Sequence, residues 1–579
     1  MIVILAVIAV NAWWVEHFRR GYPLDTDEAG YMGIAFDYTA AWRGGGISGL
    51  WQAFVAQKAQ APLVPLLTVP IALVHEGILS NFGIELAFLA LLGLACYGIG
   101  ARFGGPSYGL LAVIAVLTVP SVIDFTREYI FALPATALFA AALWALIRSD
   151  SLTSPAWAAT FGALLGASVL ARTMMIGLVP GPLLAAALQA SLRDKGRRPA
   201  LLHLGIAVAT GCGLAAIWLA SSWSSVLNYL TTAGYGPQAA AQFGRSATIA
   251  TIVIQQYLYL PLAILVGITL LAGVLSQLRS QRAKARRRVG KQATAGGRKL
   301  ADSHALTLAR TLCSSAAFPL AVAVLAGCAA LQSTRNGGSG FELPLVPPLV
   351  LLALWALAQI EPPWLRRGLL SCLVGVSVLN LVSKADVWRA VSRPAAATIP
   401  VLGYVPIVNG DSYQTYLLRL DGYQLGPPTQ PWPAALRDWN DADRITAARL
   451  LSIARGHGRD PVFFLGSRNP LFNPNTIGFA GRLYYGVTIP VGALDPTIGG
   501  DTVASYEQQL SDPARGQPNL LVLSDPSPGE YRPTISQAKA ALAAAALGFK
   551  RTAAEVLPDG RRATIWWLRR GPLAPARTG

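Results

Sequence analysis

Long apolar runs recur through the first 385 residues, and they constrain the fold more than any other feature of the chain. A helix needs about 20 mostly apolar residues to cross the hydrocarbon core of a membrane. Backbone amides find no water in that core, so runs of this length must be helical there. Only 13% of the residues are charged, whereas a soluble globular chain has roughly 25%. The sequence therefore predicts a polytopic α-helical membrane protein.

The apolar runs predict about eleven transmembrane helices. The first is expected at the N-terminus. The alternative for residues 1–15, the apolar region of a signal peptide, lacks a basic start and a small-residue cleavage site. The other ten are expected at residues 82–101, 109–123, 129–147, 156–171, 174–191, 200–220, 249–276, 311–331, 345–360 and 368–384.

Basic residues predict how these helices are oriented. Residues 277–310 hold ten Lys and Arg and one acid, Asp302, as is typical of a cytoplasmic loop beside anionic lipid. A cytoplasmic N-terminus places this loop inside, together with the basic residues at 102, 148, 193–198 and 366–367. This topology places Arg19 and Arg20 outside the cytoplasm, against the rule that basic residues stay inside. The two exceptions are acceptable if these arginines belong to a functional site. The net charge of +18 comes without any nucleic-acid-binding module, so nucleic acid is not an expected partner.

Two domains are expected. Residues 1–384 form the membrane domain, and its first outer loop, 16–81, is rich in aromatic residues that predict helices lying at the membrane interface. Residues 385–579 contain short apolar runs at 461–465 and 519–523 and a Pro-Asp-Gly turn between two further runs, which predict a small α/β domain. An odd number of spans places this C-terminal domain outside the cytoplasm. We therefore expect a multi-pass protein of the cell (inner) membrane.

Three acids crowd the first outer loop at Asp25, Asp27 and Glu28. Carboxylates packed this closely repel each other unless a cation or hydrogen-bond donor balances them. A carboxylate in such a place can act as a general base toward a hydroxyl, or bind a divalent metal that holds a phosphate. The alternative interpretation is a solvated acidic loop.

Further charges are expected on the same outer face, at the membrane boundary, where charged side chains are costly and often functional. Arginines that face carboxylates suit a ligand that carries a phosphate and a metal. Placement at a helix end is the alternative for any one of them. The chain has no P-loop and no nucleophile elbow, so neither nucleotide-driven transport nor serine hydrolysis is expected. The outer charges in question are Arg127, Glu128, Arg172 and Arg335.

The element Asp27-Glu28-Ala29-Gly30-Tyr31 resembles the acidic signature of GT-C-fold glycosyltransferases that use lipid-linked sugars. The protein O-mannosyltransferases and the bacterial lipid A aminoarabinose transferases are members of this superfamily. Gln60-Ala61-Pro62-Leu63, with Lys58 nearby, resembles the Lys-Pro-Pro-Leu stretch of those enzymes, and residues 341–348 resemble their later Tyr-x-Leu-Pro-x-x-Pro segment. The resemblance covers roughly residues 1–384.

The resemblance implies a GT-C-like membrane domain that moves a sugar, hexosyl or pentosyl, from a polyprenyl-phosphate donor to an extracytoplasmic glycan, lipid or protein acceptor. It implies that Asp27 is the general base for an inverting attack and that Glu28 holds the loop or assists a metal. Asp27 and Glu128 are the expected ligands of a divalent metal, Mg²⁺ or Mn²⁺. The expected ligands of the donor phosphate are Arg127, Arg172, Arg335 and Lys58.

Two other functions stay open. A transporter or flippase of lipid-linked glycans would need paired helical repeats and charged residues within the spans. A non-catalytic scaffold of the cell envelope would bind partners through its C-terminal domain, and its outer-loop acids would be dispensable.

Overall fold

The computed structural model describes residues 1–56, 60–75, 77–193, 196–235, 248–292, 313, 315–334, 340–410, 436–467, 469–526, 530 and 534–568. The chain forms two compact units. The first consists of Met1–His17 and Tyr38–Pro427, and the second of Phe18–Asp37 and Pro428–Gly579. The division expected at residue 385 differs from this one, because Phe18–Asp37 packs with C-terminal residues and the chain just after 385 packs with the membrane helices.

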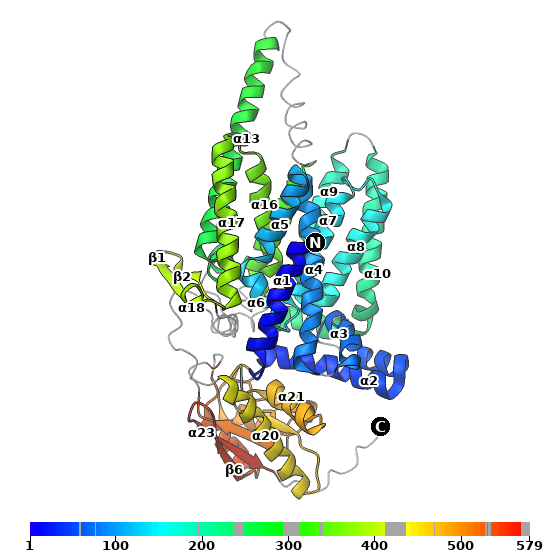
Figure 1. Cartoon of the computed structure of the whole chain (residues 1–579). Helices are drawn as coiled ribbons and strands as arrows, with labels where there is room; N and C mark the ends of the chain where they lie inside the picture. The colour runs from blue at the N-terminus through cyan, green and yellow to red at the C-terminus, as the bar shows by residue number, and fades with distance from the viewer. Residues whose placement is uncertain are drawn as a thin grey trace. The chain divides into compact units, whose positions relative to one another are not determined.

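The first unit is a bundle of apolar helices (Figure 1). Short π and 3-10 turns connect several of them, namely η2 (Thr173–Gly177), η3 (Leu230–Gly234), η4 (Val253–Leu258) and η5 (Leu343–Leu345). The helices are α1 (Ile2–Trp14), α3 (Leu63–Val74), α4 (Ile78–Gly104), α5 (Pro106–Leu117), α6 (Pro120–Thr126), α7 (Ala132–Arg148), α8 (Pro155–Ala171), α9 (Pro180–Ser191), α10 (Arg197–Tyr229), α12 (Ile249–Ile252), α13 (Tyr259–Gln292), α15 (Ala317–Thr334), α16 (Val346–Ala358), α17 (Pro363–Ala385) and α18 (Arg389–Ser392).

Each of the predicted spans coincides with a helix, and the prediction of a polytopic helical membrane protein is confirmed. The count of eleven is not confirmed. Within the described part of the chain, seven helices are long and apolar enough to cross a membrane, or eight if α5 and α6, bent by 67° at their junction, count as one span. The other three counterparts, Ala132–Arg148, Pro155–Ala171 and Leu343–Ala358, are shorter apolar helices.

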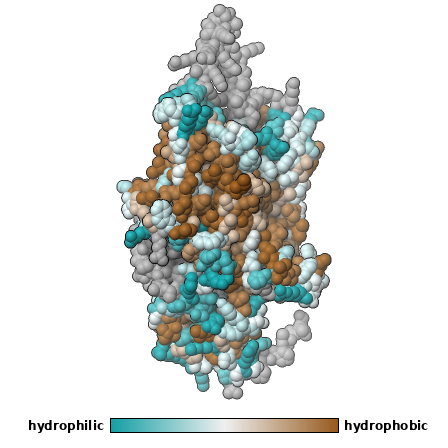
Figure 2. All heavy atoms as spheres, in the orientation of Figure 1, coloured by the Kyte–Doolittle hydropathy of each residue, from teal (hydrophilic) through white to brown (hydrophobic). Residues whose placement is uncertain are grey.

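Apolar side chains cover the outside of this bundle. Figure 2 shows a broad apolar surface over the helices of the first unit. Large aliphatic side chains such as Leu202 on α10 and Leu271 on α13 are 67% and 62% exposed. In water such a surface would be costly. In lipid the same side chains meet hydrocarbon, as expected of membrane helices.

Small residues let α8 and α10 approach until their backbones touch. A Cβ atom added to Gly162 would lie 1.9 Å from the carbonyl oxygen of Ala207, and one added to Gly166 would lie 2.4 Å from that of Gly211. Both pairs repeat at a spacing of four residues, the small-xxx-small pattern that drives helix association in lipid. This contact holds the two helices together without polar side chains.

The second unit is an α/β fold. Its five-stranded sheet has the order β4-β3-β5-β7-β6, in which β4, β3 and β5 are parallel and β7 runs antiparallel to both β5 and β6. The strands are β3 (Phe463–Leu465), β4 (Val491–Ala493), β5 (Leu520–Ser524), β6 (Lys550–Val556) and β7 (Arg562–Trp567). The helices are α20 (Leu436–Gly456), α21 (Pro474–Tyr485), α22 (Val503–Ser511) and α23 (Gln537–Ala546), with a 3-10 turn, η6 (Pro513–Arg515).

The predicted α/β domain is confirmed in its central features. The apolar runs expected at 461–465 and 519–523 are β3 and β5, and the Pro-Asp-Gly turn joins β6 to β7. Gly560 closes this turn with φ +83°, a value that favours glycine. The core lies between the sheet and α22 and α23, and includes Phe464, Tyr506 and Leu521.

Two further strands, β1 (Ala395–Ile399) and β2 (Gly403–Val408), pair antiparallel and belong to the first unit. Helix α2 (Thr26–Ala56) begins in the second unit and ends in the first, with a break at Gly46. The π turn η1 (Val15–Arg19) likewise spans the division of the units after His17.

Candidate functional site

The three acids of the first outer loop lie at the start of α2, within the second unit. Asp25 is the residue before the helix, and its Oδ1 accepts the backbone N–H groups of Asp27 at 2.6 Å and Glu28 at 3.1 Å. The backbone N–H of Asp25 in turn donates to Oε2 of Glu28 at 3.5 Å. This reciprocal pair is a capping box, which satisfies N–H groups that the first helical turn leaves open.

Arg19 supplies the cation that this cluster needs. Its guanidinium forms a buried ion pair with Glu28, and the same guanidinium donates to the carbonyl oxygen of Pro23 at 3.0 Å. Arg19 is 2% exposed, and Asp25 and Glu28 are 0% exposed. Two of the three acids are therefore structural, and the arginine that opposed the positive-inside rule holds one of them.

Asp27 is the exposed acid of the three. It occupies the first turn of α2, where the helix dipole favours a negative charge. Its backbone is fixed by Asp25 while its side chain faces outward. The arrangement leaves one of the three acidic residues exposed at a helix start.

Helix α21 packs against this helix start inside the second unit. Asn475 donates its side-chain N–H to the carbonyl oxygen of Thr26 at 2.8 Å. Further along, Arg482 forms an ion pair with Asp37, and the ring of Phe479 stacks on Phe36 with centroids 5.4 Å apart. The position of the acidic turn is thus set by residues more than 400 positions later in the chain.

A second cluster of charges lies in the first unit, and we call it the polar layer: Asp124, Arg127, Arg172, Tyr257, Glu342 and Lys384. Arg127 follows α6 and is 1% exposed. It donates from Nε to Oδ1 of Asn11 at 2.8 Å and from Nη1 to the carbonyl oxygen of Lys384 at 2.7 Å. Its guanidinium also lies 4.3 Å from the ring centroid of Trp14. Arg127 therefore ties α1, α6 and α17 together.

Lys384 and Asp124 form the ion pair at the centre of the layer, with Nζ and Oδ1 2.7 Å apart and side chains 1% and 0% exposed. Lys384 also donates to the hydroxyl of Tyr259 at 3.4 Å. A buried charge without its partner costs several kcal/mol. Lys384 closes the last turn of α17. It was not among the sites expected from the sequence, where a lysine at a helix end is unremarkable.

Arg172 and Glu342 are both linked to the backbone of Gly340, Arg172 directly and Glu342 through Tyr257. Arg172 donates to the carbonyl oxygen of Gly340 at 2.9 Å, and its guanidinium lies 4.6 Å from the ring of Phe341. The hydroxyl of Tyr257 accepts the N–H of Gly340 at 3.0 Å and donates to Oε2 of Glu342 at 2.9 Å. The ring of Tyr257 stacks on Phe125, the neighbour of Asp124. These contacts join both halves of the polar layer.

Polar groups that the sequence analysis did not single out are buried beside this layer. The hydroxyl of Tyr129 lies 2.7 Å from that of Thr68 and close enough to Glu85 for the two to interact electrostatically. One turn before Glu85 on α4, Asn81 is 0% exposed. Its amide has no hydrogen-bond partner among the residues that the structure describes. Paired polar residues one turn apart in an apolar span could have identified this group.

The structure brings together some of the expected site residues. Arg127 and Arg172 both belong to the polar layer, and Glu128 is buried next to Arg127 in sequence. Asp27 and Glu28 belong to the other unit. Lys58 and Arg335 lie outside the described residues. In the described part of the chain no group of three or more His, Cys, Asp and Glu side chains could hold a metal, so the metal remains a prediction.

Comparison with solved structures shows which fold the chain has. No family model and no curated protein sequence matches the chain. Two solved structures of ArnT from Cupriavidus metallidurans are similar over nearly the whole length of both chains. The one bound to undecaprenyl phosphate has a TM-score of 0.51 and 14% identity, and covers 98% of this chain and 97% of its own. The apo structure has a TM-score of 0.52 and 15% identity, with 97% of each chain covered. The expected GT-C-like fold is confirmed.

Proposed function

We propose that this chain is a membrane glycosyltransferase that moves a sugar from a polyprenyl-phosphate donor to an extracytoplasmic acceptor. The observation that carries the proposal is the likeness to ArnT over 98% of the chain, since it extends across both units. ArnT, a GT-C aminoarabinose transferase, is bound to undecaprenyl phosphate in one of its structures. A lipid phosphate is the group that the proposed donor carries.

Asp27 is the general base of the proposed reaction. Asp25 and Glu28 are committed to the helix cap and to Arg19, whereas the carboxylate of Asp27 is exposed. It takes the proton from the acceptor hydroxyl as the oxygen attacks the anomeric carbon. The bond from that carbon to the phosphate oxygen breaks on the opposite face, so the configuration inverts.

The leaving group is a polyprenyl phosphate, and its negative charge must be stabilised as the bond breaks. Arg127, Arg172, Lys58 and Arg335 are the proposed phosphate ligands. Of the two that the structure describes, Arg172 is the better candidate, because it is less buried than Arg127. A divalent ion at Asp27 and Glu128 would add positive charge, but no step above depends on it.

The orientation of the first unit supports an extracytoplasmic acceptor. Gln255 in η4, at the start of α13, donates to the carbonyl oxygen of Leu402 at the edge of the β1–β2 ribbon. Seven of the ten basic residues of the segment 277–310 lie in the C-terminal part of α13, a helix of 34 residues that spans about 50 Å. If this basic segment is cytoplasmic, the β1–β2 ribbon at the opposite end of α13 lies on the outer side (Figure 1).

Replacing Asp27 tests the proposal. With purified protein in liposomes and radiolabelled polyprenyl-phosphate sugars, we expect Asp27→Asn to lower the transfer rate roughly 10²- to 10⁴-fold, the usual effect of losing a general base. Asp438→Asn, at an exposed carboxylate of the same unit, serves as the matched control and should keep the wild-type rate. Equal transfer rates for wild type and Asp27→Asn would remove the proposed base, whereas no transfer by the wild-type protein from any of the donors would favour the scaffold hypothesis.

A further inference from the structure

The α/β sheet of the second unit has a topological switch point. The chain leaves β3 through α21 toward β4 on one side, and it leaves β5 through α23 toward β6 and β7 on the other side. The connections therefore diverge at the carboxyl ends of β3 and β5, which are parallel neighbours. In open α/β sheets, ligands bind in the crevice that forms outside such a pair of strand ends.

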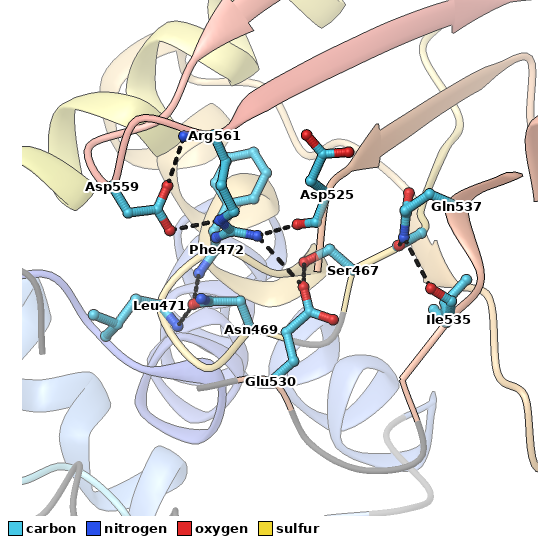
Figure 3. A network of polar contacts seen from close by, with 11 residues as sticks. Ser467, Asn469, Leu471, Phe472, Asp525, Glu530, Ile535, Gln537, Asp559 and Arg561 are labelled. Atoms are coloured by element: carbon cyan, nitrogen blue, oxygen red, sulfur yellow. Dashed lines mark hydrogen bonds and ion pairs between the residues drawn. The ribbon is translucent and has the colours of Figure 1, made fainter. Parts of the chain in front are cut away.

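Polar side chains gather at these two strand ends (Figure 3). Ser467 follows β3 after Gly466, and its hydroxyl donates to Oε1 of Glu530 at 3.0 Å. Oδ1 of Asn469 accepts the backbone N–H groups of Leu471 and Phe472 at 2.8 and 3.1 Å, which shapes the loop after β3. Ser467, Asn469 and Glu530 are 1%, 0% and 7% exposed. We call this group the strand-end cluster.

Among the residues that the structure describes, the charges of the strand-end cluster disfavour an anionic ligand. Arg561 enters it from the start of β7, with Nε 2.6 Å from Oδ2 of Asp559 and Nη1 3.5 Å from Oε1 of Glu530. Nη1 of Arg561 also donates to the carbonyl oxygen of Asp525. In the described part of the cluster two carboxylates thus face one guanidinium, and little positive charge is left for a phosphate or carboxylate.

Three polar atoms around the cluster lack hydrogen-bond partners among the described residues: Oγ of Ser524, Nη2 of Arg561 and Oε1 of Gln537. Ser524 ends β5 and is 2% exposed. Gln537, at the start of α23, donates its side-chain N–H to the carbonyl oxygen of Gly466. Its amide oxygen then has no partner among the described residues. Buried polar atoms are nearly always paired, so unpaired ones at one place call for a missing partner.

We propose that the strand-end cluster binds a neutral, hydroxyl-rich ligand, that is, a saccharide. A sugar hydroxyl both donates and accepts a hydrogen bond, and the cluster offers both: carboxylate and amide oxygens accept, a guanidinium N–H donates, and two serine hydroxyls do either. No step of the proposed transfer reaction uses these residues. The site goes beyond that reaction and gives the second unit a binding role of its own.

The proposal is tested by measuring saccharide binding to the full-length protein in detergent micelles, without any donor. Saturation-transfer NMR and calorimetry are run with mannotriose, galactotriose and cellotriose as neutral probes, and with trigalacturonic acid and inorganic phosphate as anionic ones. We expect at least one neutral probe to bind more tightly than either anion. The measurement gives an answer whether or not the chain transfers sugar.

Ser524→Ala is the decisive variant, because a hydroxyl with no described partner can be removed with little effect on folding. It should weaken binding of the neutral probe about fivefold to tenfold, the effect of one lost hydrogen bond, at an unchanged melting temperature. Glu530→Gln should weaken it further, and the matched control Ser511→Ala, at an exposed serine of α22, should not. Failure of every neutral probe, a preference for an anion, or wild-type affinity in Ser524→Ala and Glu530→Gln would each overturn the proposal.

Discussion

Arg19 is the residue on which the acidic turn depends. Its guanidinium is buried against Glu28 and the carbonyl oxygen of Pro23, so the acid at the third position of α2 is charged without being free to react. The next residue, Arg20, is exposed. The two adjacent arginines thus differ in burial, and Arg19 holds the turn that carries Asp27.

Arg19→Gln should therefore destabilise the second unit by about 3–5 kcal/mol, because it leaves the carboxylate of Glu28 buried without its cation. Arg20→Gln is the matched control and should change stability by less than about 0.5 kcal/mol, as is usual for an exposed side chain. Thermal unfolding of the purified variants, with amide exchange at the start of α2, measures both. Equal stability of the two variants would contradict the role given to Arg19.

Asp443 makes the stability of the second unit depend on pH. It lies buried on α20 and accepts a hydrogen bond from Thr476 at 3.0 Å. Burial raises the pKa of this carboxyl well above its usual value, and the nearby Glu555 raises it further, although the hydrogen bond from Thr476 opposes both. The folded state thus holds the proton more tightly than the unfolded state, so its stabilisation is complete below about pH 4 and is lost as the pH rises through the folded pKa.

We expect Asp443→Asn to be more stable than the wild type at pH 8 and to lose much of the wild type's decline in melting temperature between pH 5 and pH 8. Asparagine keeps the oxygen that accepts from Thr476 but carries no charge to bury. Asp441→Asn, at a residue whose side chain is 63% exposed on the same helix, should follow the wild-type curve. A wild-type melting temperature that rises over this range would refute the assignment.

At the scale of elements, local sequence patterns predict where helices and strands lie, but they do not predict which of these elements contact each other. The apolar runs predicted where α4, α7 and α17 lie, and alternation with turn residues predicted β3, β5 and the β6–β7 hairpin. Helix ends were less predictable. The Asp25-x-x-Glu28 spacing is a capping-box pattern that was interpreted as mutual repulsion, because the position of Arg19 could not be known from the sequence.

The contact between α8 and α10 gives a prediction at this scale. Gly162→Ala places a methyl group within 1.9 Å of the carbonyl oxygen of Ala207, so the helices must separate, at a cost of about 1–3 kcal/mol or more. Gly213→Ala, on α10 with no atom within 4 Å of the added methyl group, should be neutral or slightly stabilising. Melting temperatures of the two variants in the same detergent compare them directly. Similar values would show that the close approach adds nothing.

At the scale of the molecule, the membrane fold could be predicted and the assembly of the site could not. The acidic signature predicts Asp27 as the base, which stays a prediction, and charge at the boundary singles out Arg127 and Arg172, which the structure places in the polar layer. Lys384 and Glu85 were missed, because their importance depends on burial against Asp124 and beside Tyr129. That Asn475 would bond to Thr26 could not be foreseen either, since no local pattern reports a contact across more than 400 residues.

The prediction at the scale of the whole molecule concerns its membrane topology. A periplasmic reporter such as alkaline phosphatase, fused after Gly579, should be active, and one fused within the basic loop at 277–310 should be inactive, because basic loops stay inside. A cysteine placed at position 27 should react with an impermeant maleimide added from outside. The reverse pattern, or labelling only after the cell is opened, would place Asp27 away from the donor phosphate expected on the outer face.

The division of the chain into units has a consequence for biosynthesis. Phe18–Asp37 is made early, but the rest of its unit begins at Pro428. A ribosome adding 5–20 residues per second needs about 20–80 seconds to make the intervening segment. Throughout that interval Phe36 lacks the ring of Phe479 and Asp37 lacks Arg482. A nascent chain stalled anywhere before α21 emerges would thus carry the proposed base at the start of α2 without the contacts that α21 later makes with that helix.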